Sequence, residues 1–177
     1  MDEKTNKTLG EYIFQLAKGN IKVLENIYLI IAKILYSVGN IYFSQKADIE
    51  DAIQDLLIVL YYKAHKFREN RNACAWVVKI YQNLILNKLK HRMKENDFIS
   101  DRIEKLQLEV NQSDEKFIEN HLFVKELFGN LTRQEQQLII YRFWCNCSLS
   151  EISIILKKPK STIESQIKKI EEKVKSF

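Results

Sequence analysis

Residues 48–66, with the sequence DIEDAIQDLLIVLYYKAHK, decide the fold of this chain. Apolar side chains recur along the stretch at three- and four-residue steps, at Ile53, Leu56, Leu57 and Leu60. This spacing places them on one face of an α-helix, which is the pattern of a helix packed against a core. Asp48 is the predicted N-cap, because an aspartate can accept a hydrogen bond from the unpaired N–H groups of a first turn. We therefore expect a helix from Asp48 to about Lys66.

Helical spacing also fills the chain on both sides of this stretch. Apolar residues recur at the same steps in Leu9–Leu16 and Ile21–Val38, and Gly39-Asn40 is predicted to end the second of these helices. After a polar turn ending at Asn72, a further helix is expected over about residues 73–93. Its inward face is predicted to hold Trp76, Val77, Ile80, Leu84 and Leu89. Four helices thus form a first compact domain.

The C-terminal part carries its own helix signals. Ser113 and Asp114 can cap a helix that reaches Gly129, and Thr132 with Glu135 forms a capping box for a helix to Trp144. Two short helices close the chain, Leu149–Leu156 and about residues 159–175, and Pro159 suits the start of the second. Strand-like alternation is nearly absent. The predicted fold is therefore all-α, with two small helical domains at 1–95 and 113–177 joined by an acidic linker at 96–112.

Charge is distributed in blocks along the chain. The net charge is +5 and the isoelectric point about 9.0. Residues 67–95 carry seven basic and two acidic side chains, and residues 131–177 carry nine and five; residues 48–66 and 96–130 are acidic. Two basic regions separated by an acidic spacer favour an anionic partner such as a nucleic acid.

Several classes of protein fit the sequence poorly. We find no nucleophile–base pair, phosphate-binding loop or paired-carboxylate site, so we expect neither an enzyme nor a cofactor or small-molecule substrate. Cys145 and Cys147 could form half of a metal site, but no second pair of ligands stands at a suitable spacing, so no metal is expected. With Cys74 they make an odd number of cysteines without a preceding signal peptide, which indicates reduced thiols in a cytoplasm. The apolar region Ile21–Phe43 is interrupted by charged residues, so it is predicted to be a core helix and not a membrane span.

The last two helices fit a helix-turn-helix, in which the second helix lies in the major groove of DNA. The outward face of that second helix carries Lys160, Ser161, Glu164, Ser165 and Lys168. Lysines suit phosphates and short polar groups suit base edges. The alternative is an ordinary helical hairpin with a solvated polar face. Glu164 favours that alternative, because its carboxylate repels phosphate.

Three runs of sequence resemble the bacterial RNA polymerase sigma factors of the extracytoplasmic-function (ECF) type. Residues 48–55, DIEDAIQD, resemble the family's D-x-E-D-hydrophobic-x-Q-E/D signature. Residues 75–87, AWVVKIYQNLILN, are similar to A-W-L-x-R-I-A-R-N-x-x-x-D, and residues 131–142, LTRQEQQLIIYR, to L-P-x-x-x-R-x-V-h-x-L-R. The likeness covers about residues 9–175 and implies a region 2 domain, a linker and a region 4 helix-turn-helix domain.

The resemblance implies three sets of site residues. Docking on core RNA polymerase would use Asp48, Glu50, Asp51, Gln54, Asp55 and Leu57. Recognition and melting of the promoter −10 element would use Arg68, Arg71, Asn72, Lys79, Asn83, Asn87 and Lys90. Contact with the −35 element would use Lys160, Ser161, Thr162, Glu164, Ser165, Lys168 and Lys169. Tyr62 and Phe67 are the aromatic side chains expected to be exposed for base stacking, whereas Trp76 and Tyr81 are expected in the core.

The chain also departs from the family pattern. Asn87 stands where an aspartate is frequent, Glu164 and its neighbours replace common arginines, and Lys157 stands where a turn glycine is usual. Many members of the family are held inactive by an anti-sigma factor, so the resemblance brings such a partner into consideration. Two alternative functions stay open: a stand-alone helix-turn-helix regulator that uses only the C-terminal helices, and a sigma-like decoy that binds polymerase without opening promoters.

Overall fold

The computed structural model describes residues 1–69, 71–99 and 128–175, and these form helices, turns and short connections without a strand. The N-terminal helices are α1 (Glu3–Ala17), α2 (Val23–Tyr42), α3 (Lys46–Lys63), the single 3₁₀ turn η1 (Ala64–Lys66) and α4 (Ala73–Ile99). The C-terminal helices are α6 (Arg133–Ile139), the π-helix η2 (Ile140–Trp144), α7 (Leu149–Leu156) and α8 (Lys160–Lys175). The all-α prediction is confirmed.

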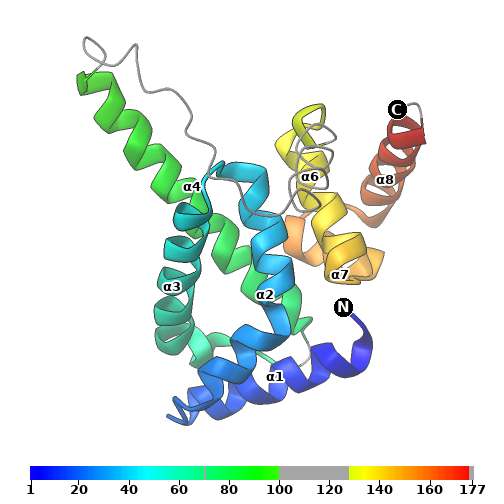
Figure 1. Cartoon of the computed structure of the whole chain (residues 1–177). Coiled ribbons are helices and arrows are strands. Elements are labelled where there is room, and N and C mark those ends of the chain that lie inside the picture. The colour runs from blue at the N-terminus through cyan, green and yellow to red at the C-terminus, as the bar shows by residue number, and fades with distance from the viewer. Residues whose placement is uncertain (70, 100–127, 176–177) are drawn as a thin grey trace.

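Helices α1 to α4 pack around one apolar core, with α4 in contact with each of the other three (Figure 1). The largest buried side chains there include Leu9, Ile31, Leu56, Tyr81 and Ile85. Helix α4 is covered on several sides, so its most buried residues, Val77, Val78, Tyr81 and Ile85, form a broader face than the predicted stripe. Of that stripe only Val77 is fully buried, and the other four residues are half-buried.

The start of α3 differs from the prediction. The helix begins at Lys46, and Gln45 occupies the N-cap position without a side-chain hydrogen bond, so Asp48 is not the N-cap. Asp48 is the third residue of the helix, in its first turn, and its carboxylate accepts hydrogen bonds from Arg92 of α4. The ion pair with a neighbouring helix therefore replaces the local capping bond that the sequence pattern suggested.

Helix α2 continues through Gly39 to Tyr42, so the predicted break at Gly39-Asn40 is wrong. A Cβ atom at Gly39 would lie 2.7 Å from Ile49 Cγ2 and 2.9 Å from the Tyr81 hydroxyl oxygen. The glycine is thus needed for the close approach of α3 and α4 to α2, and the backbone stays helical.

The apolar length of α2 is used in the core. Among the described residues it is the one helix long and apolar enough to match a membrane span by length and composition. Its side chains Ile27, Ile31, Leu35 and Val38 are buried among α1, α3 and α4. The predicted role as a core helix agrees with this packing.

The C-terminal helices start as the sequence indicates. The Thr132–Glu135 capping box is present, and a second box, Ser148 with Glu151, starts α7. The predicted helix to Trp144 has the expected extent, but its last five residues are π-helical, with a hydrogen bond of 3.0 Å from Cys145 N–H to Ile140 C=O. The predicted linker is helical at its start, because α4 reaches Ile99. Residues 100–127, which hold the rest of that linker and the predicted helix from Ser113, lie outside the described residues.

The turn between α7 and α8 adopts the conformation that usually requires glycine. Lys157 has φ 55° and ψ 44°, in the left-handed region. Lys158 N–H then donates to Ser153 C=O at 3.1 Å, and this bond closes the turn. The family pattern has a turn glycine at this position. Lys157 therefore adopts the left-handed backbone conformation that is typical of glycine.

Candidate nucleic-acid interface

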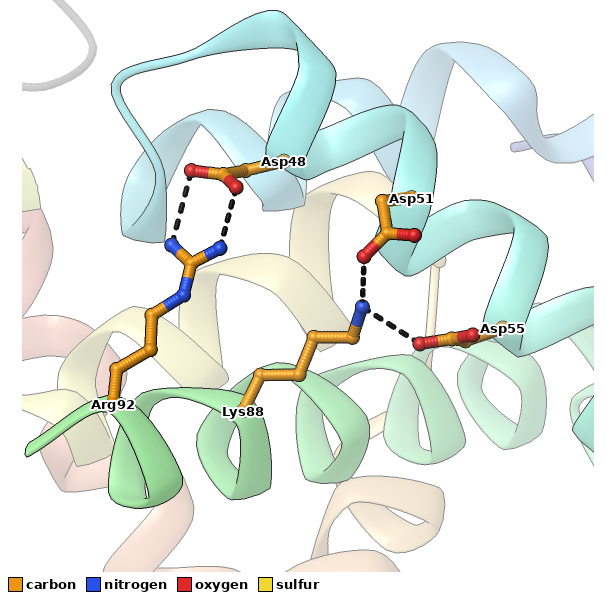
Figure 2. Close-up of polar contacts among 5 residues, drawn as sticks. All are labelled: Asp48, Asp51, Asp55, Lys88 and Arg92. Carbon is orange, nitrogen blue, oxygen red and sulfur yellow. Dashed lines mark hydrogen bonds and ion pairs between the residues drawn. The ribbon is translucent and has the colours of Figure 1, made fainter. Parts of the chain in front are cut away.

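The carboxylates predicted for polymerase docking form a ridge on α3, here called the acidic ridge: Asp48, Glu50, Asp51 and Asp55. Three of them point toward α4, as Figure 2 shows. Arg92 donates two hydrogen bonds to Asp48, of 2.5 and 3.0 Å. Lys88 Nζ contacts Asp51 and lies 2.7 Å from Asp55 Oδ2. The ridge is therefore partly neutralised within the molecule.

These ion pairs alter the proton affinities of their members. The hydrogen bond from Arg92, together with its charge, holds the pKa of Asp48 below its usual range. Burial alone would lower the pKa of Lys88, but the hydrogen bonds to Asp51 and Asp55 outweigh burial and raise it. Asp48 and Lys88 are consequently charged at neutral pH. The Asp51 side chain is still 63% exposed, so it keeps access to a partner.

The fourth carboxylate of the acidic ridge faces a different helix. Glu50 accepts a hydrogen bond of 3.2 Å from the Tyr36 hydroxyl of α2 and lies 3.5 Å from Lys46 Nζ. Burial, with Tyr28 and Glu50 nearby, raises the pKa of Tyr36 to about 12, so this hydroxyl keeps its proton. The predicted docking residue Gln54 is exposed, whereas Leu57 is half-buried.

The polar face predicted for α4 is present. Lys79, Asn83, Asn87 and Lys90 are all exposed, as their steps of four, four and three residues require. Arg68 and Arg71, in the turn before α4, are exposed as well. Lys79, Asn83, Asn87 and Lys90 form a basic and amide-bearing surface along α4, and Lys79 also contacts the C-terminal helices.

The aromatic side chains follow the prediction in part. Tyr62 is 69% exposed and stacks edge to face on Tyr61, and Tyr81 is fully buried, as expected. Phe67 is only 6% exposed, so its predicted role as an exposed stacking platform is wrong. Its ring packs between Phe14 and Trp76, each with a centroid separation of 5.3 Å. The turn before α4 packs against α1, so the Phe67 ring is not accessible for stacking on a base.

Asn72 has two structural partners. Its Oδ1 accepts a hydrogen bond of 2.9 Å from Ala75 N–H, which makes it the N-cap of α4. Its Nδ2 donates to the Cys145 carbonyl at 3.1 Å. Lys79 Nζ likewise donates to the Ile155 carbonyl at 3.0 Å. Two of the residues predicted to face the −10 element are therefore engaged by the C-terminal helices.

The predicted reading helix α8 turns its apolar side inward. Ile163, Ile167 and Ile170 are buried, whereas six of the seven residues predicted for −35 contact are exposed and Thr162 is half-buried. Glu164 forms an ion pair of 3.7 Å with Lys168, one turn further on. The positive charge of Lys168 offsets part of the repulsion between Glu164 and phosphate. An ion pair of 2.6 Å between Lys173 and Glu135 ties α8 to α6.

The three cysteines lie where the two groups of helices meet, and all are free and buried. Hydrogen bonding to Cys74, followed by burial, raises the pKa of the Cys145 thiol well above its usual value. Burial raises the pKa of Cys147 to about 12. Within the described residues no cluster of histidine, cysteine and acidic side chains could hold a metal ion.

Two sets of contact residues were not predicted from the sequence: those that hold the two groups of helices together, and those that pair with the acidic ridge. Lys88 and Arg92 stand four residues apart on α4, and their match to the carboxylates of α3 was a usable signal. Gln82 and Tyr141, whose buried side chains meet at 3.0 Å, gave no such signal. Their pairing depends on how the two groups of helices lie together.

Comparison with known proteins relates part of this chain to a known family. Residues 30–95, which hold the second part of α2, all of α3 and most of α4, match the family "Sigma-70 region 2". None of the curated protein sequences matches the chain. In fold the chain is similar to CnrH in complex with the cytosolic domain of CnrY (TM-score 0.66, 16% identity, covering 97% of this chain and 96% of that one). It is also similar to the sigma factor RpoE of Bartonella quintana in complex with the anti-sigma factor NepR (TM-score 0.62, 20% identity, 86% and 93%). The family match supports the predicted resemblance to sigma factors over residues 30–95, and the two similar structures agree with the predicted fold.

Proposed function

Because residues 30–95 carry a sigma-70 region 2 module, we propose that the chain binds core RNA polymerase and directs it to specific promoters. The observation that carries this proposal is the geometry of α3 and α4. These two packed helices present an acidic ridge on one side and a basic and amide-bearing surface on another. One rigid unit can therefore hold a positively charged protein surface and a DNA strand at the same time.

The basic and amide-bearing surface of α4 is the proposed contact with the −10 element, and we call it the −10 surface. It is suited to a DNA strand that has been separated from the duplex. Extruding a base costs a few kcal/mol, least at flexible A·T-rich steps, and contacts with the protein must return that energy. Lys90 and Arg71 can hold phosphates, and Asn83 and Asn87 can bind base edges through their amides. The exposed ring of Tyr62 offers a stacking surface, worth about 1–3 kcal/mol per base.

The C-terminal helices supply the proposed −35 contact. Helix α8 packs on α7 through buried isoleucines and leaves Lys160, Ser161 and Lys169 outward. We infer that α8 acts as a recognition helix whose N-terminal residues reach base edges in the major groove. A stand-alone DNA-binding regulator would need only this part, and it would leave the acidic ridge without a role. The family match over residues 30–95 favours the sigma factor.

An inhibitory partner also fits the proposal. One of the similar structures is a sigma factor bound to an anti-sigma factor, and the other is bound to a cytosolic domain of a second protein. We therefore propose an anti-sigma factor as a further partner. We propose no enzymatic role, cofactor or metal. The family match and these folds are consistent with a cytoplasmic protein.

The test is reconstituted transcription. The purified chain with sigma-free core polymerase should give transcripts with defined starts from a cognate promoter, and neither component should do so alone. Gln54→Arg, which lies outside the ion pairs of the acidic ridge, should weaken the complex with core. Asn83→Ala with Lys90→Ala should leave that complex intact and reduce the permanganate reactivity of melted promoter bases.

Two outcomes would contradict the proposal. If the folded chain never associates with core polymerase yet binds duplex DNA specifically, it is a stand-alone regulator. If it associates with core but no promoter yields melted bases, it is a decoy. Lys7→Ala, at an exposed position of α1, serves as a control for the loss of one positive charge alone.

A further inference from the structure

Glu164 is the one carboxylate in the first part of α8, residues 160–169, where a recognition helix meets base edges. The charged residues beside it in this part are Lys160, Lys168 and Lys169. Glu164 is the fifth residue of the helix and its side chain is 51% exposed, whereas the preceding Ile163 is buried in the core. A surface that only binds phosphate has no use for this carboxylate, because the carboxylate repels the phosphates that the lysines attract.

The carboxylate of Glu164 is paired with the ammonium group of Lys168, one turn further along α8. The Glu164 Oε1 and Lys168 Nζ atoms are 3.7 Å apart, and the Lys168 side chain is 70% exposed. A glutamate four residues before a lysine is the favourable order for an ion pair on a helix. The pair therefore presents a group that can only accept hydrogen bonds beside a group that can only donate them.

A C·G base pair presents the complementary groups in the major groove. The N4 amino group of cytosine donates and O6 of guanine accepts, and the two atoms lie about 2.9 Å apart because they are hydrogen-bonded to each other. The carboxylate of Glu164 can accept from cytosine N4 while the ammonium group of Lys168 donates to guanine O6 and N7. Both charged groups then have partners when water leaves the groove.

The other base pairs match the ion pair less well. In A·T, the N6 amino group of adenine lies beside N7, an acceptor that repels a carboxylate, and thymine offers the lysine one acceptor next to a methyl group. In a reversed C·G pair, the carboxylate faces the acceptors of guanine and the ammonium group faces an amino group. The ion pair therefore favours C·G in one orientation.

From this match we infer that Glu164 and Lys168 together recognise one C·G base pair of the −35 element, and that Glu164 determines the specificity at that position. The inference rests on the proposed function, since it assigns a base pair to the same recognition helix. The neighbouring Ser165 hydroxyl donates to the Thr162 carbonyl at 3.0 Å, so its proton is held within the helix. Glu164 lowers the affinity for every sequence by repelling phosphate and recovers part of it only at cytosine, which raises specificity.

The test determines base preference by selection from a library of DNA duplexes that carry a randomised segment. The full-length chain with sigma-free core polymerase selects the duplexes, and those that remain bound are sequenced. Glu164→Gln is the decisive variant, because a glutamine side chain both donates and accepts and thus pairs with N6 and N7 of adenine. Glu171→Gln is the matched control, since Glu171 is exposed about two turns, roughly 10 Å, further along the same side of α8. Circular dichroism checks that each variant keeps the wild-type helix content.

The wild-type chain should select duplexes with a C·G pair at one position, and replacing that pair by T·A should lower the affinity by about fivefold or more. In Glu164→Gln the preference at this position should change from cytosine to adenine, while every other position keeps its wild-type base. Glu171→Gln should retain the cytosine. Lys168→Ala should reduce the discrimination between C·G and T·A at the same position, because the guanine loses its donor.

The inference is overturned if Glu164→Gln binds all duplexes more tightly without a change of base preference at any position. In that case the carboxylate only repels phosphate. It is also overturned if the position that responds to Glu164→Gln does not prefer C·G in the wild-type chain. Discrimination that stays at its wild-type value in Lys168→Ala would remove the lysine, and with it the recognition of both bases by one ion pair.

The proposed function fails by a different result. In that case the chain with core polymerase enriches no duplex, or the chain enriches the same duplexes without core and none of them yields transcripts with defined starts. If duplexes are enriched and transcribed but their base preferences change in neither Glu164→Gln nor Lys168→Ala, the chain recognises promoters and only the assigned base pair is wrong. The two failures are therefore distinguishable.

Discussion

Replacing Lys88 by alanine removes the one ammonium group that bridges Asp51 and Asp55, and the structure predicts opposite effects on stability and on polymerase binding. The Lys88 side chain is 25% exposed and its two partners are 63% and 43% exposed. Solvent screens such pairs, so each contributes about 0.2–1 kcal/mol. Alanine returns a few tenths of a kcal/mol in helix propensity, roughly 0.2–0.3. The free energy of unfolding should fall by about 0.5–1.5 kcal/mol.

The same substitution frees two carboxylates of the acidic ridge. If the ridge docks on core polymerase, the association constant should rise by a comparable energy, about two- to tenfold. Urea unfolding followed by circular dichroism gives the stability, and titration of labelled core polymerase gives the affinity. Lys33→Ala, at an exposed position of α2, is the control with the same change of charge, and it should shift stability by less than about 0.5 kcal/mol.

The reasoning is refuted if Lys88→Ala weakens polymerase binding while Lys33→Ala does not. In that case the ion pairs would hold α3 in the conformation that binds, and the carboxylates would not be the docking groups. Unchanged stability together with unchanged affinity would mean that Lys88 contributes to neither. Only the combination of lower stability and tighter binding supports the proposed ridge.

Three further predictions concern the fold. Gly39→Ala should destabilise the protein by about 1–2 kcal/mol, because the new Cβ collides with Ile49. Gly10→Ala should stabilise the protein by about 0.5–1 kcal/mol, because the nearest contact of its Cβ would be 3.5 Å away. Equal urea midpoints for the two variants would contradict this prediction. Lys157→Gly should raise the unfolding temperature, since it relieves about 1 kcal/mol of left-handed strain, and a lower value would argue that the turn is unstrained. The free energy of unfolding should be constant between about pH 7 and pH 9 and should fall toward pH 12, because burial raises the pKa of Cys147 to about 12 and the thiol of the unfolded chain ionises first; a fall that begins only above pH 10 would exclude Cys147.

Local signals in the sequence predicted most of the helices. The capping box at Thr132 depends on residues three positions apart, and it is present as predicted. The apolar steps of α2 and α3 also gave the right faces. The errors arose where a contact distant in sequence overrides a local preference. Gly39 is retained for packing and not as a break, and Asp48 bonds Arg92, which is 44 residues away, in place of its own helix.

The predicted site residues show the same limit. Exposure of Lys79, Asn83, Asn87 and Lys90 follows from helical periodicity, so it could be predicted. Burial of Phe67 could not, because it depends on the packing of the turn against Phe14 of α1. The hydrogen bonds between the N-terminal and C-terminal helices depend on the relative placement of these two groups, and no periodicity within either group encodes them. Whether these residues contact polymerase and promoter stays a prediction.

The N-terminal and C-terminal helices are joined by hydrogen bonds from Met1, Asn72, Lys79 and Tyr141, and this contact should respond to ionic strength differently from the binding of DNA. The acceptors of these bonds are neutral, three backbone carbonyls and one side-chain amide oxygen. Dissolved ions therefore weaken the contact little. Binding to a phosphate backbone loses affinity steeply as salt rises, since it releases condensed counterions. Concentrated electrolyte should thus leave the two groups of helices together while it weakens the binding of a nucleic acid to α4.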